Sequence, residues 1–227
     1  MPPLDVITTG RPDLTARAQR HGCLRGTRLD KEPAYRKRGI RVDFLDLHWA
    51  DPDSEDLVEA AAWHRPKYVV AGDYEHRDDD GELVGDPAEV VNERARRLRE
   101  HAENVIVVPH TPGQVEHVPE WAVVGYSTPT TYGGTEAPIW EYRGRDLHIL
   151  GGTPHQQLDI LGYLGSDVVS VDGNSYHKAA TKGAKYWRDD PAKHWHRVDQ
   201  DGPEAVVSAY ARSIRNWVGA LERRGWI

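Results

Sequence analysis

Cysteine is nearly absent from this chain: Cys23 is the single thiol among 227 residues. One cysteine excludes an intramolecular disulfide and any zinc site built from several cysteines, and it favours a reducing compartment. Long apolar runs are also lacking, since none approaches the ~18 residues that a membrane-spanning helix needs. Residues 1–10 do not show the charged and then apolar pattern of a signal peptide. We therefore expect a cytoplasmic protein with no membrane partner.

Positive charge is outweighed overall but is unevenly distributed. The chain carries 29 Lys and Arg against 36 Asp and Glu, a net charge of −7 that argues against a generally basic, nucleic-acid-coating surface. Residues 11–41 are nevertheless strongly cationic, and the stretch that follows to about residue 90 is rich in acids. This segregation predicts an electrically divided surface.

Short apolar segments alternate with helical patterns along almost the whole chain, which is typical of β-α units around a parallel sheet. About eight such strands close a (β/α) barrel, and 227 residues is short for that fold. We therefore predict one domain over residues 1–227, a compact (β/α)8 TIM-like barrel with some helices short or missing. The predicted strands are 4–10, 42–49, 67–74, 104–110, 121–127, 146–152, 167–173 and 184–187.

Three helices are predicted from their own sequence chemistry. Two begin with a proline at the first position and a capping box, and the second of these should end at Gly165. Their starting residues are Asp86, Pro87 and Glu89 in the first and Thr153, Pro154 and Gln156 in the second. A long amphipathic helix closes the chain, with its apolar stripe in the core. That stripe is Val207, Tyr210, Ile214, Trp217 and Leu221.

Two segments fit neither pattern. Residues 23–41 are interpreted as a long basic connection, and residues 128–145, rich in Thr, Gly and Pro, as a long loop. Loops of this length within a compact domain are often functional.

Aspartates stand at the ends of three predicted strands. They are Asp46, Asp73 and Asp172. A lone aspartate before a turn is most often a cap or turn residue. Three at one barrel mouth, however, repel one another and raise at least one pKa, a cost that chemistry explains better than folding. Paired carboxylates at a glycosidic carbon suit displacement with retention, in which one attacks the anomeric carbon and another moves protons.

Three consecutive motifs, the last of which contains Asp172, follow a family pattern. "VVGYSTPTTYGG", "DLHILGGTPHQQL" and "GSDVVSVDGN" follow one another as strand-and-loop units. This succession resembles the tRNA-guanine transglycosylase superfamily. With the "GRPDLT" start, the chain resembles more closely the short, phage-encoded branch that acts on DNA, the DNA 7-deazaguanine transglycosylases. The resemblance covers most of the chain in order.

The resemblance implies a glycosyltransferase that exchanges guanine in DNA for a free 7-deazaguanine base such as preQ0, with no cofactor. It implies that Asp172 is the nucleophile on C1′ and that Asp46 is the general base for the incoming base. Asp43 is the alternative base, because strand alternation places residues 43 and 46 on opposite faces. Glycosidase or nucleosidase hydrolysis on the same fold, or non-catalytic nucleic-acid binding with the aspartates as caps, are the competing interpretations.

Further substrate contacts follow from the same resemblance. Asp73 would read the amino and ring N–H groups of the purine, because a carboxylate accepts two hydrogen bonds at once. His110 replaces a glutamine that contacts the base in longer members. The other implied contacts are Gly125, Tyr126 and Ser127 through their backbone, and Gly151 and Gly152 through close approach of the chain. Asn174 would either steer Asp172 or cap the following helix.

The tRNA enzymes hold a structural zinc with three cysteines and a histidine, a site that one cysteine cannot supply. No metal is expected, and the pair His194 and His196 is interpreted as surface or nucleic-acid-facing. The target nucleotide must be flipped out or single-stranded. Basic residues would then bind its phosphates, or these basic residues form only a solvated surface. The phosphate candidates are Arg11, Arg36, Lys37, Arg38, Lys178 and Lys182. Candidate base-stacking or core aromatics are Tyr126, Tyr132, Tyr176 and Trp187.

Overall fold

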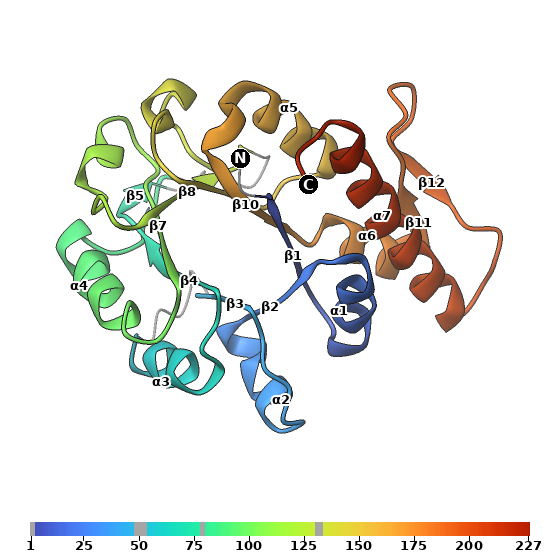
Figure 1. Cartoon of the computed structure of the whole chain (residues 1–227), viewed down its shortest axis with the longest axis horizontal. Helices are drawn as coiled ribbons and strands as arrows, with labels where there is room; N and C mark the ends of the chain where they lie inside the picture. Colours follow the sequence, from blue (N-terminus) through green and yellow to red (C-terminus); the bar gives the residue numbers. More distant parts are fainter. Residues whose placement is uncertain (1–2, 48–53, 78–79, 130–133) are drawn as a thin grey trace.

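The chain forms a closed barrel of parallel strands. A computed structural model describes residues 3–47, 54–77, 80–129 and 134–227. In this part of the chain eight strands close the barrel in the order β1, β2, β3, β4, β7, β8, β9, β10. Figure 1 shows them as a ring with helices outside it. The strands are β1 (Asp5–Thr9), β2 (Leu24–Arg28), β3 (Phe44–Asp46), β4 (Tyr68–Asp73), β7 (Asn104–Val108), β8 (Val123–Ser127), β9 (Leu147–Leu150) and β10 (Val168–Gly173). The predicted TIM-like barrel is therefore confirmed.

Helices cover the barrel unevenly. In their described parts, the connections β7–β8 and β8–β9 contain the 3-10 turns Gln114–His117 and Ile139–Tyr142 instead of α-helices, so the prediction of missing helices is correct there. The α-helices are α1 (Pro12–Ala18), α2 (Glu32–Arg36), α3 (Ser54–His64), α4 (Ala88–Leu98), α5 (Pro154–Leu164), α6 (Ser175–Gly183) and α7 (Pro203–Arg223). Outside the barrel lie two hairpins, β5 (His76–Arg77) with β6 (Leu83–Val84) and β11 (Lys185–Trp187) with β12 (Trp195–Arg197).

The eighth barrel strand is not the predicted one. Residues 184–187 contain β11, which pairs antiparallel with β12 and not with the barrel. The barrel is completed by β2, which lies inside the segment interpreted as a basic connection and pairs with β1 and β3. A Cβ at Gly26 would lie 2.9 Å from the ring of Phe44, so this glycine lets the interior close around a large side chain.

The two capping predictions have different outcomes. At α5 the reciprocal bonds between Thr153 and Gln156 are present, and Gly165 ends the helix with φ 65°. At α4 the prediction is wrong: Pro87 occupies the N-cap position and no side chain caps the helix. Asp86 instead accepts a hydrogen bond from Arg94 Nη2 at 2.7 Å. The Asp86 carboxylate thus pairs with Arg94, which lies two turns into α4, and does not cap the start of the helix.

Apolar side chains fill two layers, one inside the barrel and one between strands and helices. The stripe of α7 lies in the outer layer, where Tyr210, Ile214, Trp217 and Leu221 are fully buried and Val207 packs against them. Trp187 packs edge-on against Trp217 with ring centroids 5.8 Å apart. The predicted core role of this helix is confirmed. Across the described residues, no helix combines the length and apolarity needed to cross a membrane.

Candidate active site

The three predicted aspartates lie at the same end of the barrel, which we call the mouth: the end where the parallel strands finish. Asp46 is the last residue of β3, Asp73 is the last of β4, and Asp172 is the penultimate residue of β10. Phe44 belongs to the interior apolar cluster, so strand alternation directs Asp46 to the interior as well. Asp43 faces the other side, where its carboxylate accepts the backbone N–H of Arg25 at 2.9 Å. Asp46 is therefore the residue at the mouth.

A β-bulge turns Asp73 toward the same interior. The register between β4 and β7 shifts between Val70 and Gly72, which reverses the alternation after that point. Gly72 has φ 137°, and a Cβ there would lie 2.7 Å from Arg94 Nη1. Buried Arg94 donates to the carbonyl of Ala71 at 2.8 Å and so stabilises the bulge from outside. Without the bulge, Gly72 would face the interior at this point and offer no side chain. With the bulge, the carboxylate of Asp73 faces the interior there.

His110 holds Asp73 in place. Its Nε2 donates to Asp73 Oδ1 at 2.7 Å, and its backbone N–H donates to Gln114 Oε1 at 2.8 Å. Its ring stacks on His76, with ring centroids 3.7 Å apart and planes 7° apart. The ring is buried, donates to Asp73 and stacks on His76, so His110 fixes the orientation of the Asp73 carboxylate.

Asp172 is oriented by the turn after β9. The backbone N–H of Gly151 donates to Asp172 Oδ1 at 2.9 Å, and the side chain is only 12% exposed. Gly151 and Gly152 have φ 67° and 76°, a left-handed turn that a glycine pair makes at low cost. Gln157 Nε2 from α5 donates to the carbonyl of Gly151 at 2.7 Å and fixes the turn from behind. At Gly151 a Cβ would meet nothing within 4 Å, so backbone conformation explains this glycine.

The carboxylates influence one another electrostatically. The pKa of Asp46 is raised well above the ordinary 3.8, chiefly by burial and then by the negative charges of Asp172 and Asp73. The residue as a whole is only partly buried, so the carboxyl group lies deeper in the protein than the rest of Asp46 suggests. Arg28 at the end of β2 offsets only part of the rise. The arrangement thus favours the protonated form of Asp46 beside two other carboxyl groups.

The β8 residues differ in what they can offer a ligand. Gly125 lies inside the barrel, where a Cβ would come within 2.7 Å of Leu150 and 2.8 Å of Val108, so packing explains this glycine. Tyr126 points outward and packs edge-on against Tyr142 at 5.0 Å. Ser127, partly exposed, ends the strand, and its carbonyl accepts the N–H of Thr135 at 3.0 Å.

Other residues predicted at the site have simpler environments. Asn174 is exposed at the N-cap of α6 and makes no side-chain cap, so the capping alternative is wrong. Tyr176 and Trp187 are fully buried, and Tyr126 is nearly so, which makes them core residues and not base-stacking platforms. Tyr132 lies outside the described residues.

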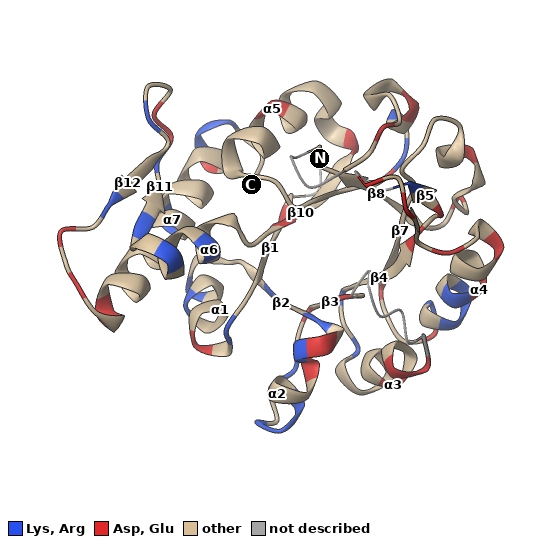
Figure 2. Cartoon of the chain, turned by 180° about the vertical axis from the view of Figure 1, so that it is seen from behind, with Lys and Arg blue, Asp and Glu red and all other residues tan. Residues whose placement is uncertain are grey.

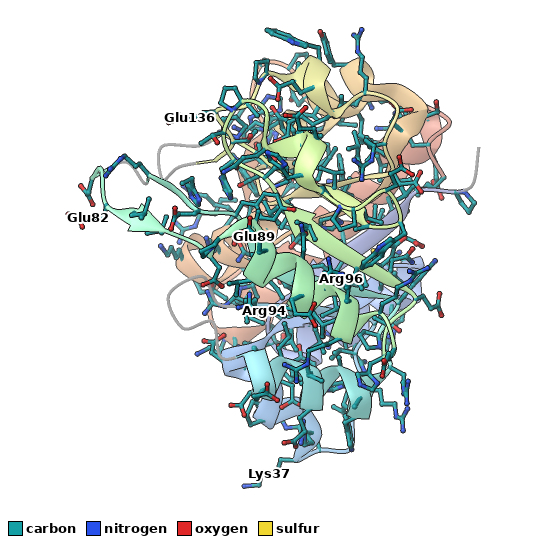
Figure 3. The ribbon with its side chains drawn as sticks, turned by 90° about the vertical axis from the view of Figure 1, so that its left-hand side faces the viewer. Lys37, Glu82, Glu89, Arg94, Arg96 and Glu136 are labelled. Carbon is teal, nitrogen blue, oxygen red and sulfur yellow. The ribbon has the colours of Figure 1, made fainter. Side chains whose placement is uncertain are left out.

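The predicted phosphate-binding residues do not form one surface. Arg11 pairs with Asp13 at 2.8 Å, and Arg36 pairs with both Glu32 and Glu59. Arg38 is exposed in the turn after α2. Lys37 lies in the same turn, and Figure 3 shows it at the bottom of the molecule, with Glu136 in the upper part. Glu136 is a mouth residue, since its N–H donates to the carbonyl of His110 at 2.7 Å.

Lys178 and Lys182 are better placed. They lie on α6, which follows Asp172 directly, and with Lys185 and Trp195 they line a shallow pocket of about 290 Å³. Figure 2 shows basic residues on α6 and its surroundings, on one side of the molecule. Only the start of α6 is tied to the mouth, because Ser175 follows the end of β10 closely in the chain.

The sequence interpretation missed one buried residue of the site, His148. It stands between Leu147 and Ile149 in β9, fully buried, with Nε2 at 3.5 Å from Asp172 Oδ1. The signal was present, because a histidine in the middle of an apolar strand must find a polar partner. His194 and His196 lie elsewhere: His194 stacks on His155 at 4.1 Å, and His196 Nε2 donates to the carbonyl of Lys193 at 2.8 Å. Within the described ranges, no three His, Cys, Asp or Glu residues are grouped to hold a metal.

The fold and site define a parallel (β/α)8 barrel with a carboxylate cluster at the carboxyl ends of its strands. Residues 18–222 match the family model described as "Family of unknown function (DUF6610)", and the chain belongs to this family. Among solved structures, the chain is similar to the truncated form of 3-deoxy-D-arabino-heptulosonate 7-phosphate synthase from Thermotoga maritima. The identity is 9%, the match covers 97% of this chain and 86% of that chain, and the TM-score is 0.39. No curated protein matches the sequence.

Proposed function

We propose that the protein is a base-exchange glycosyltransferase, a pentosyltransferase that replaces guanine in DNA by a free 7-deazaguanine base such as preQ0. The observation that carries the proposal is the meeting of three carboxyl groups at the mouth, where the pKa of Asp46 is raised by burial, Asp172 and Asp73. Paired carboxyl groups of this kind perform displacement with retention at an anomeric carbon. The motif order that resembles the DNA 7-deazaguanine transglycosylases supports base exchange as the reaction.

The first half-reaction removes guanine. One oxygen of Asp172 attacks C1′ of the flipped nucleotide, and the bond from C1′ to the base nitrogen breaks with its electron pair remaining on guanine. Asp46 donates its proton to the departing base, a role that suits a carboxyl group whose pKa is raised. The product is an ester between Asp172 and the deoxyribose, together with free guanine.

The second half-reaction is the reverse with a different base. The ring N–H of the 7-deazaguanine loses its proton to the Asp46 carboxylate, and the nitrogen attacks C1′. The ester bond from C1′ to the Asp172 oxygen breaks, which restores the free carboxylate. The proton that Asp46 gives to guanine in the first half-reaction returns to it from the incoming base in the second. No reactant other than the two bases and the DNA is needed.

Recognition of the base and of the strand uses neighbouring residues. Asp73, held by His110 at 2.7 Å, offers its second oxygen to the amino and ring N–H groups of the purine. Lys178 and Lys182 contact phosphates of the strand that carries the flipped nucleotide, because they lie on the helix that begins beside Asp172.

Nucleoside mass spectrometry tests the proposal. DNA and tRNA are incubated separately with the protein and preQ0 or related bases, and both the modified nucleoside and released guanine are quantified. We expect modification of DNA, and Asp172→Asn should abolish it while leaving DNA affinity nearly unchanged. Asp167→Asn is the matched control, since Asp167 accepts the N–H of Gly144 at the opposite end of β10 and should tolerate the change.

Each alternative gives a different product. Abasic sites without a new base would identify a hydrolase. Modification of tRNA alone would show that the substrate is tRNA and not DNA. Exchange that persists in Asp172→Asn would remove this residue as the nucleophile. Binding without any turnover, with aspartate variants that are merely less stable, would identify a nucleic-acid-binding protein.

A further inference from the structure

His148 occupies the inside of the barrel directly beneath Asp172. It is the second residue of β9 and is 0% exposed. One side of its ring stacks on Phe44, with ring centroids 5.5 Å apart and planes 27° apart. The ring therefore has a defined orientation, and its two nitrogens face two residues of the neighbouring strand β10.

The two nitrogens have different partners. Nδ1 lies 2.8 Å from Ser170 Oγ, a hydrogen bond within the buried interior. Nε2 lies 3.5 Å from Asp172 Oδ1 and, among the described residues, is a buried nitrogen without a hydrogen-bond partner. A buried polar atom left unpaired loses its hydrogen bond to water without a replacement. A nitrogen kept in this position next to a carboxylate needs an explanation beyond packing.

The geometry selects one tautomer. If Nδ1 carried the proton, the lone pair of Nε2 would face a carboxylate oxygen, which is repulsive. If Nε2 carries the proton, Ser170 donates its hydroxyl hydrogen to Nδ1 in preference to the neighbouring Tyr68 hydroxyl, and Nε2–H points at Asp172 Oδ1. The separation of 3.5 Å is long for a hydrogen bond, and such contacts in ligand-free active sites shorten when the reacting complex forms.

We propose that His148 is a positioning residue for the nucleophile and that Ser170 sets its tautomer. Gly151 N–H and His148 Nε2–H both address Oδ1 of Asp172, from the turn and from the barrel interior. With Oδ1 held twice, Oδ2 is the oxygen that attacks C1′. This inference rests on the proposed base exchange for its kinetic consequence but not for its structural one.

The structural consequence is measured without any substrate. In protein with ¹⁵N-labelled histidine, NMR should show His148 protonated on Nε2 and unprotonated on Nδ1. Ser170→Ala should change the Nδ1 signal, and Asp172→Asn the Nε2 signal. A ring protonated on Nδ1, or an Nε2 signal that ignores Asp172→Asn, would overturn the inference.

The kinetic consequence is measured with a matched pair of variants. In His148→Gln the amide nitrogen takes a place near that of the imidazole Nε2, so a donor to Asp172 remains. In His148→Asn it takes a place near that of Nδ1 and faces Ser170 only. We expect His148→Asn to lower kcat about 100-fold with KM little changed, the order of loss that follows from misplacing a reacting group. His148→Gln should recover most of that rate.

Stability measurements separate positioning from folding. Both variants introduce an amide at the same buried place, so a merely structural role would lower the melting temperature and the rate together in both. Equal rates for the two variants would overturn the positioning role. If wild-type protein shows no base exchange while the NMR pattern holds, the proposed function has failed and the contact between His148 and Asp172 stands.

Discussion

Replacing Asp46 by asparagine should stabilise the fold, and the gain should grow with pH. The pKa of Asp46 in the folded protein lies well above the ordinary 3.8. Ionising this carboxyl group is therefore less favourable in the folded protein than in the unfolded chain, which lowers the free energy of unfolding. The loss begins as pH rises through 3.8 and is complete once pH exceeds the folded-state pKa. Asparagine never ionises, so the variant escapes the loss while keeping nearly the same shape.

The size of the effect follows from linkage. Each pKa unit of elevation corresponds to about 1.4 kcal/mol of lost stability at high pH. For a chain of 227 residues, one kcal/mol moves the melting temperature by roughly 2–4 °C. Because burial and two carboxylates all act in the same direction on the pKa of Asp46, we expect the variant to melt at a higher temperature than the wild type near neutral pH. At about pH 4 the variant and wild type should melt at nearly the same temperature.

Thermal unfolding followed by circular dichroism across this pH range measures the difference. Asp43→Asn is the control, because Asp43 accepts the Arg25 N–H at 2.9 Å away from the mouth and should show no gain that grows with pH. Base exchange should fall about 10²- to 10⁴-fold in Asp46→Asn, the usual contribution of a general acid–base group. An Asp46→Asn protein that is less stable than wild type at every pH would refute the reasoning, because it would make Asp46 a structural cap.

Two further substitutions test the supports of the site. Arg94→Met should lower the free energy of unfolding by about 3 kcal/mol, the low end for breaking a buried ion pair, because Asp86 remains partly in solvent. Denaturant unfolding measures this loss. An unchanged free energy of unfolding would show that the bulge at Ala71 does not need this arginine. Gly125→Ala should cost about 1–3 kcal/mol through overpacking against Leu150 and Val108 at 2.7 and 2.8 Å. If the alanine variant instead keeps its stability and loses only activity, Gly125 contacts the substrate.

Local sequence predicted the elements whose signals are themselves local. The capping box of Thr153 and Gln156 and the apolar stripe of α7 depend on neighbours within one helix, and both are present. The capping box after Asp86 was predicted on equal grounds and is absent, because Arg94, two turns along the same helix, takes the Asp86 carboxylate. A short motif does not reveal such a competitor.

Barrel closure could not be predicted strand by strand. The residues of β2, "LRGTR", carry one apolar side chain and lack the apolar run of a strand, whereas those of β11, "KYW", look more strand-like. What makes β2 a strand is its pairing with β1 and β3 and the space that Gly26 leaves for Phe44. Hydrogen bonds between parallel strands depend on partners distant in the chain, so they override the weak preference of five residues.

The sequence by itself determined the class of fold and identified three aspartates that end strands, because short apolar runs that alternate with helical patterns are recognised locally. Tertiary structure alone decided that Asp46 and not Asp43 faces the mouth, that a bulge turns Asp73 inward, and that His148 lies beneath Asp172. These outcomes depend on barrel closure, on the register between strands and on charges brought together across the mouth. Such interactions join residues far apart in the chain, so they cannot be predicted from a short stretch of sequence.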